Sequence, residues 1–167
     1  WADPGHEYKP AAWRDLSFDQ LKKALYDYTK KVIQELKDQG TAPDMVQVGN
    51  EINHGMVWPD GIVSNVDSMS QLIVAGIGAV KAVDPSIVIM LHIALGGQND
   101  ESVFFMDQIM ARKVPFDVIG LSYYPKWHGT LDDLRDNMND LLRRYDKDII
   151  VVEYSAKKKE VNKLVFE

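Results

Sequence analysis

Glu51 and Glu153 are the residues whose type and position most clearly suggest chemistry. Each follows a short apolar run typical of a buried strand, where a carboxylate is costly to bury without a partner. Two facing carboxylates are what glycoside hydrolysis requires, one as proton donor and the other as nucleophile or base. The alternative is that each glutamate is a salt-bridged residue at the end of its strand. Because the carboxyl ends of parallel strands share one edge of a sheet, both side chains are expected at the same end.

Other polar side chains stand at the same predicted strand ends. Asn50 can donate its amide to a sugar hydroxyl, or it can form an Asx turn. Tyr123 can hydrogen-bond to Glu153 across the sheet and keep that carboxylate ionised, or it can pack as a strand-end aromatic residue. His92 can bind substrate or orient a carboxylate, and the alternative is a buried core histidine.

Aromatic side chains in predicted loops suit a carbohydrate cleft, because sugar rings present apolar C–H faces that stack on aromatic planes. The candidates are Trp1, Trp58, Trp127 and His128. Loop packing is the alternative for all of them. The four histidines of the chain lack metal-ligand spacing, so the sequence predicts no transition-metal site.

The elements that must position these residues alternate between two kinds of apolar pattern. Apolar residues at three- and four-residue steps predict helices, and continuous apolar runs predict buried strands. Helices are expected between Ser17 and Gly40 and over 68–83, 101–112 and 130–145, strands over 44–49, 86–94, 116–122 and 148–153, and the start of a further helix over 155–166. This alternation predicts a parallel sheet covered by helices.

Two parallel architectures fit that alternation. A doubly wound sheet usually carries a glycine-rich phosphate-binding turn, and Gly96-Gly97 does not match its spacing. The other is a (β/α)8 TIM barrel, which needs about 250 residues. With four readable strands, residues 1–167 are expected to form a partial barrel domain, roughly the central half.

Composition narrows the class of protein further. The chain has 167 residues, 46% hydrophobic and 26% charged, and a net charge of −6, which argues against nucleic acid as a partner. It has no cysteine, so disulfides and thiolate chemistry are excluded. No continuous apolar run approaches the roughly 20 residues that cross a bilayer, so no membrane-spanning segment is expected.

The motifs around these residues resemble glycoside hydrolase family 53, the arabinogalactan endo-β-1,4-galactanases of clan A. The resemblance is carried by Trp-Ala-Asp-Pro-Gly at 1–5, by Val-Gly-Asn-Glu-Ile-Asn at 48–53, by Ser-Tyr-Tyr-Pro with Trp-His-Gly over 122–129, and by Val-Val-Glu at 151–153. It extends in order over nearly the whole chain.

The resemblance implies a retaining double displacement in a (β/α)8 barrel, covered here from after strand 3 to the start of helix 7. Glu51 would be the general acid/base and Glu153 the nucleophile, with carboxyl groups about 5–5.5 Å apart. Asn50 would bind the hydroxyl next to the reacting carbon, and Tyr123 or Tyr124 would support the nucleophile. The expected substrate-binding residues are Asn50, His92, Tyr123, Tyr124, Trp1, Trp58, Trp127 and His128.

The resemblance also implies an enzyme that cleaves β-1,4-galactan in pectin side chains, with no cofactor, and that is secreted, periplasmic or on the cell surface. No calcium is expected after the last strand, where the sequence continues directly into a predicted helix. The alternatives are a clan A glycosidase acting on another β-glycan, and a carbohydrate-binding or structural fragment without turnover. Exposed barrel edges are expected to make the isolated fragment oligomerise.

Overall fold

Two of the main helices begin after a capping box. A computed structural model describes residues 6–155, and its first long helix, α1 (Phe18–Asp38), starts after a capping box in which Ser17 and Gln20 bond reciprocally. α5 (Leu131–Tyr145) starts in the same way, after Thr130 and with Asp133. α2 (Val66–Val83) and α3 (Asn99–Ala111) begin slightly earlier than predicted, α2 because Asn65 caps its first turn.

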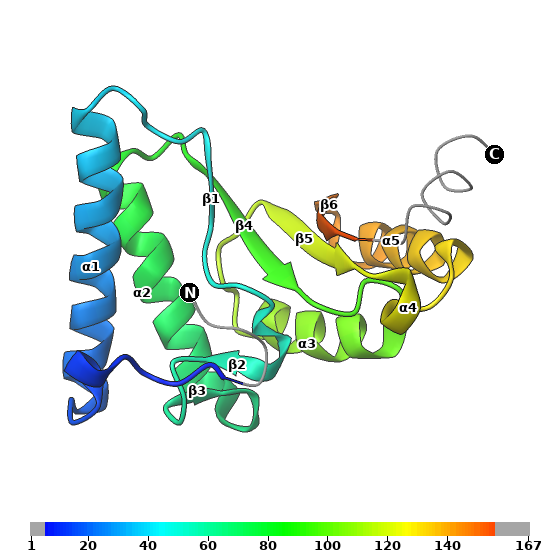
Figure 1. The fold of residues 1–167 in the computed structure, drawn as a ribbon, viewed down its shortest axis with the longest axis horizontal. Helices are drawn as coiled ribbons and strands as arrows, with labels where there is room; N and C mark the ends of the chain where they lie inside the picture. Colours follow the sequence, from blue (N-terminus) through cyan, green and yellow to red (C-terminus); the bar gives the residue numbers. More distant parts are fainter. Residues whose placement is uncertain (1–5, 156–167) are drawn as a thin grey trace.

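The strands form one parallel sheet, as the sequence predicts. β1 (Met45–Gln47), β4 (Val88–Ile93), β5 (Val118–Tyr123) and β6 (Asp148–Tyr154) lie in the order β1-β4-β5-β6. A helical connection joins each strand to the next, and Figure 1 shows β4 and β5 in the middle of the molecule. This is the strand order of consecutive βαβ units in a barrel wall.

Several short elements were not predicted from the sequence. They are η1 (Ala11–Trp13), η2 (Ile52–His54), the hairpin strands β2 (Gly55–Met56) and β3 (Gly61–Ile62), η3 (Val63–Asn65) and α4 (Pro125–His128). The loop predicted for Trp127 and His128 is therefore wrong. Pro125 occupies the first turn of α4, where its fixed φ favours a helix and its missing N–H costs nothing.

The core lies on both sides of α2. Leu72 on one face of α2 packs with Leu21 and Leu25 of α1, whereas Ile73 packs in the cluster that contains Ile89 of β4. Within the described residues, 63–83 is the stretch long and apolar enough to cross a bilayer by length and composition. Its apolar side chains here fill the space between α1 and the sheet, and Figure 1 shows α1 and α2 side by side.

The two outer strands of the sheet each have one neighbour. β1 pairs only with β4, and β6 only with β5, among the residues that the structure describes. Ile150 of β6 and Met45 of β1 are 40% and 37% exposed. The expected association of the fragment through these edges stays a prediction. Trp1 lies outside the described residues. The helix predicted over 155–166 also lies outside them, except for its first residue.

Candidate active site

The candidate site lies at the carboxyl ends of the parallel strands. Glu51 follows β1, His92 stands near the end of β4, Ser122 near the end of β5, and Glu153 near the end of β6. Both carboxylates act electrostatically on His92 and on Tyr124. The structure thus brings Glu51 and Glu153 to one polar cluster, although they are far apart in the sequence.

A sharp turn buries Glu51 at this edge. Gly49 has φ +85°, and a Cβ there would lie 2.4 Å from Cγ2 of Ile52, so only glycine fits. Glu51 itself has φ 47° and ψ 47°, a left-handed conformation that is unfavourable for a residue with a side chain. The fully buried Ile52 closes the turn, and Glu51 is left 7% exposed. Such strain persists only when the surrounding packing holds it.

An irregularity between β5 and β6 places Glu153. The register runs from Leu121 opposite Val151 to Ser122 opposite Glu153, so β6 carries one additional residue at this point. A bulge of this kind redirects the side chains that follow it. The residue opposite Glu153 is therefore Ser122, whose Oγ lies 2.8 Å from Nε2 of His92.

Tyr124 rather than Tyr123 supports Glu153. The Tyr124 hydroxyl donates to Oε2 of Glu153 at 2.7 Å. This hydrogen bond, with burial as a second cause, raises the pKa of Tyr124 to about 12, so the hydroxyl keeps its proton at neutral pH. The Tyr123 hydroxyl instead donates to the carbonyl of Gly129 at 3.0 Å. The hydrogen bond predicted from Tyr123 to Glu153 is wrong, because the Tyr123 side chain packs in the core, and the extended backbone directs the next side chain, Tyr124, to Glu153.

His92 is both a buried histidine and a neighbour of the carboxylates. Its side chain is fully buried, and Nδ1 lies 4.0 Å from Oε1 of Glu153 and has no hydrogen-bond partner among the described residues. Burial lowers the pKa of His92 from 6.5, although Glu153 and Glu51 act in the opposite direction. The imidazole is therefore neutral at neutral pH, and its Nδ1 lies near the Glu153 carboxylate without adding a charge.

The burial of His92 predicts a pH-dependent stability. Because the folded state resists protonation of His92 and the unfolded state does not, stability is lost as pH falls below about 6.5. His92→Asn is expected to reduce the drop in melting temperature between about pH 7.5 and pH 5. Melting curves at both values measure it, with His54→Asn as control because His54 is exposed. An equal drop in both variants and in the unchanged protein would contradict the prediction.

The remaining predicted substrate-binding residues differ in exposure. Trp127 is 63% exposed, with its ring 6.3 Å from that of Tyr124. Trp58 is half-buried, and its Nε1 donates to the carbonyl of His54 at 3.2 Å, as expected of a turn anchor. His128 is 6% exposed, and its Nδ1 lies 3.1 Å from the backbone nitrogen of Tyr124. This buried position suits a residue that holds the backbone of Tyr124 better than one that contacts substrate directly.

Asn50 and Trp1 complete the predicted set. The Oδ1 atom of Asn50 lies 3.4 Å from Nε2 of Gln47, in the turn beside Glu51. Trp1 lies outside the described residues. No group of three or more histidine, cysteine or acidic residues that could hold a metal ion occurs between residues 6 and 155.

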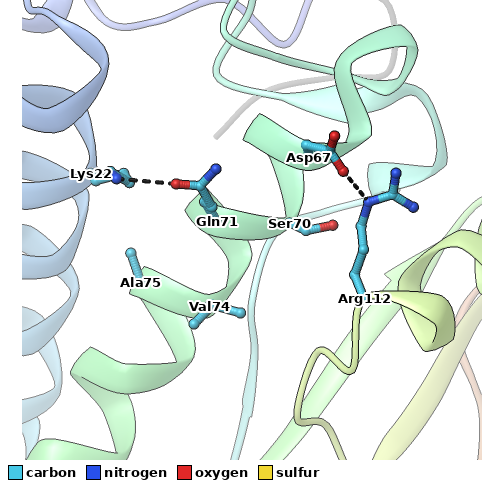
Figure 2. Close-up of a pocket in the computed structure, with 7 residues that line it drawn as sticks. All are labelled: Lys22, Asp67, Ser70, Gln71, Val74, Ala75 and Arg112. Carbon is cyan, nitrogen blue, oxygen red and sulfur yellow. Dashed lines mark hydrogen bonds and ion pairs between the residues drawn. The ribbon is translucent and has the colours of Figure 1, made fainter.

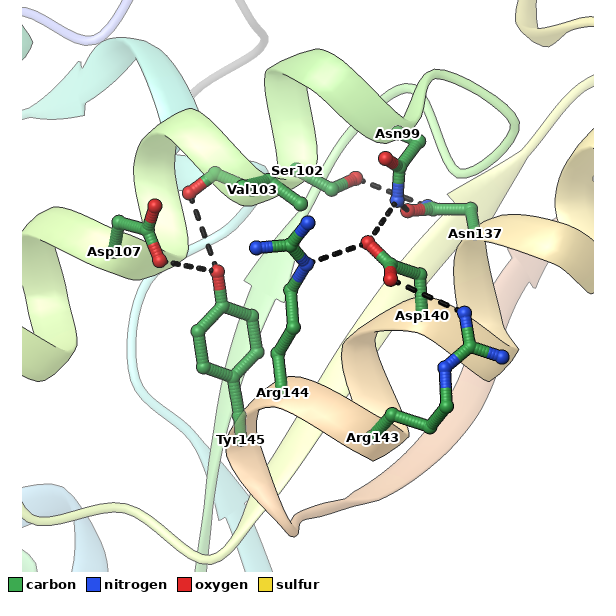
Figure 3. Close-up of polar contacts among 9 residues, drawn as sticks. All are labelled: Asn99, Ser102, Val103, Asp107, Asn137, Asp140, Arg143, Arg144 and Tyr145. Atoms are coloured by element: carbon green, nitrogen blue, oxygen red, sulfur yellow. Dashed lines mark hydrogen bonds and ion pairs between the residues drawn. The ribbon is translucent and has the colours of Figure 1, made fainter.

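A second polar cluster, between α3 and α5, was not predicted from the sequence (Figure 3). Asn137 of α5 is fully buried and donates to the carbonyl of Gly96 at 2.7 Å and to Ser102 of α3 at 3.0 Å. The Gly96 N–H in turn donates to the carbonyl of Ser122 at 2.9 Å. These bonds tie the loop after β4 to the strand that carries Ser122. An asparagine within a helical pattern gives no sequence signal of such a role.

A groove on the outer helical layer is separate from the site. It is lined by Lys22, Asp67, Ser70, Gln71, Val74, Ala75 and Arg112 (Figure 2). Its charged groups already have partners, since Lys22 lies 3.1 Å from Gln71 and Arg112 lies 2.6 Å from Asp67. None of the strand-end carboxylates lines this groove.

Comparison with known sequences gives a consistent result. Residues 1–163 match the model of a family described as glycosyl hydrolase family 53. An uncharacterized protein in the bgaB 5′ region of Niallia circulans is 52% identical over 161 residues, which cover 92% of this chain and 44% of the relative. The endo-β-1,4-galactanase of Bacillus subtilis is 36% identical, with 93% of this chain and 35% of the relative covered. The chain thus spans less than half the length of these relatives.

Solved structures share the fold. The GH53 catalytic domain from Ignisphaera aggregans superposes with a TM-score of 0.89 and 45% identity, over 92% of this chain and 42% of that one. A GH10 structure from Paenibacillus barcinonensis superposes with a TM-score of 0.67 at 18% identity, over 88% of this chain and 46% of that one, which shows the fold alone. The parallel sheet is thus part of a (β/α)8 barrel, as predicted.

Proposed function

Because the chain belongs to glycosyl hydrolase family 53, we propose that it carries the two catalytic carboxylates of an endo-acting, retaining hydrolase that cleaves β-1,4-galactan. The observation that carries the proposal is the cluster at the strand ends. Glu153 accepts a hydrogen bond from Tyr124 at 2.7 Å beside the neutral His92, while Glu51 is buried at the same edge. Galactan is proposed because relatives that match along 92–93% of the chain are named endo-β-1,4-galactanases.

In the proposed first step, a carboxylate oxygen of Glu153 attacks the anomeric carbon of a galactosyl unit. The glycosidic C–O bond breaks, and Glu51 donates its proton to the departing sugar oxygen. The product of this step is a galactosyl ester of Glu153. In the second step Glu51 accepts a proton from water, the water oxygen attacks the same carbon, and the Glu153 carboxylate leaves. Two displacements at one carbon retain its configuration.

The residues around the carboxylates have proposed supporting roles. The Tyr124 hydroxyl holds the Glu153 carboxylate through a hydrogen bond, and the uncharged His92 lies beside it without neutralising it, so that the carboxylate stays a nucleophile. Asn50 is proposed to bind the hydroxyl next to the reacting carbon, as the resemblance implies. The exposed ring of Trp127, 6.3 Å from Tyr124, is proposed as a stacking surface for a sugar ring at the edge of the site.

The proposed biological setting follows from that substrate. β-1,4-Galactan occurs in pectin side chains outside the cells that degrade it. A protein that cleaves it is therefore proposed to act as a secreted, periplasmic or cell-surface enzyme, with the polysaccharide as its partner.

A linkage screen of the complete protein tests the proposed substrate. Release of reducing ends is expected from potato galactan, with little or none from xylan or mixed-linkage β-glucan. Hydrolysis confined to xylan would overturn the galactan assignment in favour of another clan A activity. Binding to galactan without release of reducing ends from any of the three would favour a non-catalytic carbohydrate-binding protein.

A further inference from the structure

We propose that Asn53 is a positioning residue that fixes the backbone turn carrying Glu51 and so aims the proton donor at the departing sugar oxygen. The inference rests on the proposed role of Glu51 as the general acid/base. It concerns a residue that lies two positions beyond Glu51, in η2, with no part in the proposed chemistry itself.

The first observation is where the hydrogen-bond ladder between β1 and β4 ends. The N–H of Val88 donates to the carbonyl of Asp44 at 2.9 Å, and the N–H of Val48 donates to the carbonyl of Met90 at 3.0 Å. Since backbone groups alternate in direction along a strand, the N–H groups of even-numbered β4 residues face β1. The N–H of Ala94 therefore points to the side from which β1 has already turned away.

Asn53 supplies the acceptor that the strand no longer provides. Its Oδ1 accepts the N–H of Ala94 at 2.9 Å, and the two residues are 4% and 7% exposed. A buried backbone N–H without an acceptor is costly, so this bond holds η2 against the end of β4. The amide orientation is fixed as well, because only the amide oxygen of Asn53 can accept the hydrogen bond that the Ala94 N–H donates. The Asn53 side chain thus replaces the next backbone acceptor of the β1–β4 hydrogen-bond ladder. The main chain after β1 can therefore bend at Gly49.

The second observation is that the bend itself needs anchors. Glu51 holds φ 47° and ψ 47°, which a residue with a side chain adopts only under constraint. The constraint comes from its two successors, Ile52 in the core and Asn53 on Ala94. Ala94 stands two residues after His92 on the same segment, so the bond fixes Glu51 relative to the group beside Glu153. Loss of the acceptor would release one of the two anchors and let the carboxyl of Glu51 move.

Leaving-group dependence in the complete protein tests this role. Galactan releases a sugar alcohol that needs protonation, whereas 2,4-dinitrophenyl β-1,4-galactobioside releases a phenolate that does not. Asn53→Ala is expected to lower kcat/KM on galactan by about 10–100-fold, the cost of a misplaced catalytic group, and on the dinitrophenyl substrate by less than about threefold. If Asn53→Ala does not fold, Asn53→Gln displaces the acceptor by one methylene group and is expected to give the same substrate difference.

The matched control variant removes a similar hydrogen bond, from a side-chain oxygen to a backbone N–H, at the opposite end of β4. Asp117 Oδ2 accepts the N–H of Ile89 at 2.8 Å, and Asp117→Ala is expected to change kcat/KM on both substrates equally. Equal losses on the two substrates in both Asn53 variants would overturn the inference. Glu51→Ala, assayed in parallel, separates the two proposals. If Glu51→Ala discriminates between the substrates and the Asn53 variants do not, the Asn53 role alone fails. If Glu51→Ala does not discriminate either, the proposed role of Glu51 fails with it.

Discussion

Glutamine in place of Glu153 is expected to slow galactan hydrolysis by the complete protein by about 10⁴-fold or more, as loss of a nucleophile does in other hydrolases. The amide keeps the size of the side chain, and its oxygen can still accept the hydrogen bond that Tyr124 donates at 2.7 Å. It is not a nucleophile at the anomeric carbon, so the galactosyl ester does not form. Binding of galacto-oligosaccharides is expected to stay largely intact. Initial rates and titration calorimetry measure the two effects separately.

Asp148→Asn provides the control for this change. Asp148 is an exposed carboxylate at the opposite end of β6, so its conversion to an amide is expected to leave the rate within about twofold. Near-normal turnover by Glu153→Gln would refute the nucleophile assignment. Loss of both turnover and oligosaccharide binding would show that Glu153 instead holds the sugar or the fold.

The large elements and the placement of both carboxylates at one edge of the sheet were predictable because their causes are local. The spacing of a capping box is present at Ser17 and Gln20 and at Thr130 and Asp133, and both boxes form at the starts of α1 and α5. Glu51 and Glu153 each end a continuous apolar run, and parallel strands bring such ends to one edge. The prediction thus needed only short-range patterns and one topological rule.

The details of the site were not predictable in the same way, because they depend on register and on non-local packing. The additional residue of β6 near Val152 decides that Glu153 faces Ser122, and nothing in Val-Val-Glu marks a bulge. The packing of Tyr123 in the core decides that Tyr124, the next residue along the extended chain, reaches Glu153.

Side-chain hydrogen bonds that join distant segments were not predictable either, because they also depend on non-local packing. The bonds of Asn53 to Ala94 and of Asn137 to Gly96 each join positions 41 residues apart. Neither asparagine stands in a pattern that predicts its partner. In the sequence, Asn53 stands out only as part of the motif that contains Glu51. Its hydrogen bond to Ala94, directly after β4, is seen only in the structure.

Alanine in place of Glu51 is expected to lower kcat/KM on galactan by about 10²–10⁴-fold, the usual contribution of general acid–base catalysis. On a dinitrophenyl galactobioside the first step is expected to stay fast, so the galactosyl ester of Glu153 accumulates and its hydrolysis limits kcat. Glu51 is 7% exposed, and its truncation leaves a small space beside the anomeric carbon. Azide does not need a general base, so it is expected to enter this space and restore kcat.

The stereochemistry of the azide product then distinguishes the roles of the two glutamates. In Glu51→Ala, azide displaces the Glu153 carboxylate from the ester, and the second inversion gives a β-galactobiosyl azide. In Glu153→Ala, azide takes the place of the missing nucleophile in a single inversion, and the product is the α anomer. NMR of the two products measures the difference. An α product from Glu51→Ala, or no acceleration by azide in that variant, would contradict the assignment, because only an enzyme-bound ester on the opposite face leads to the β product.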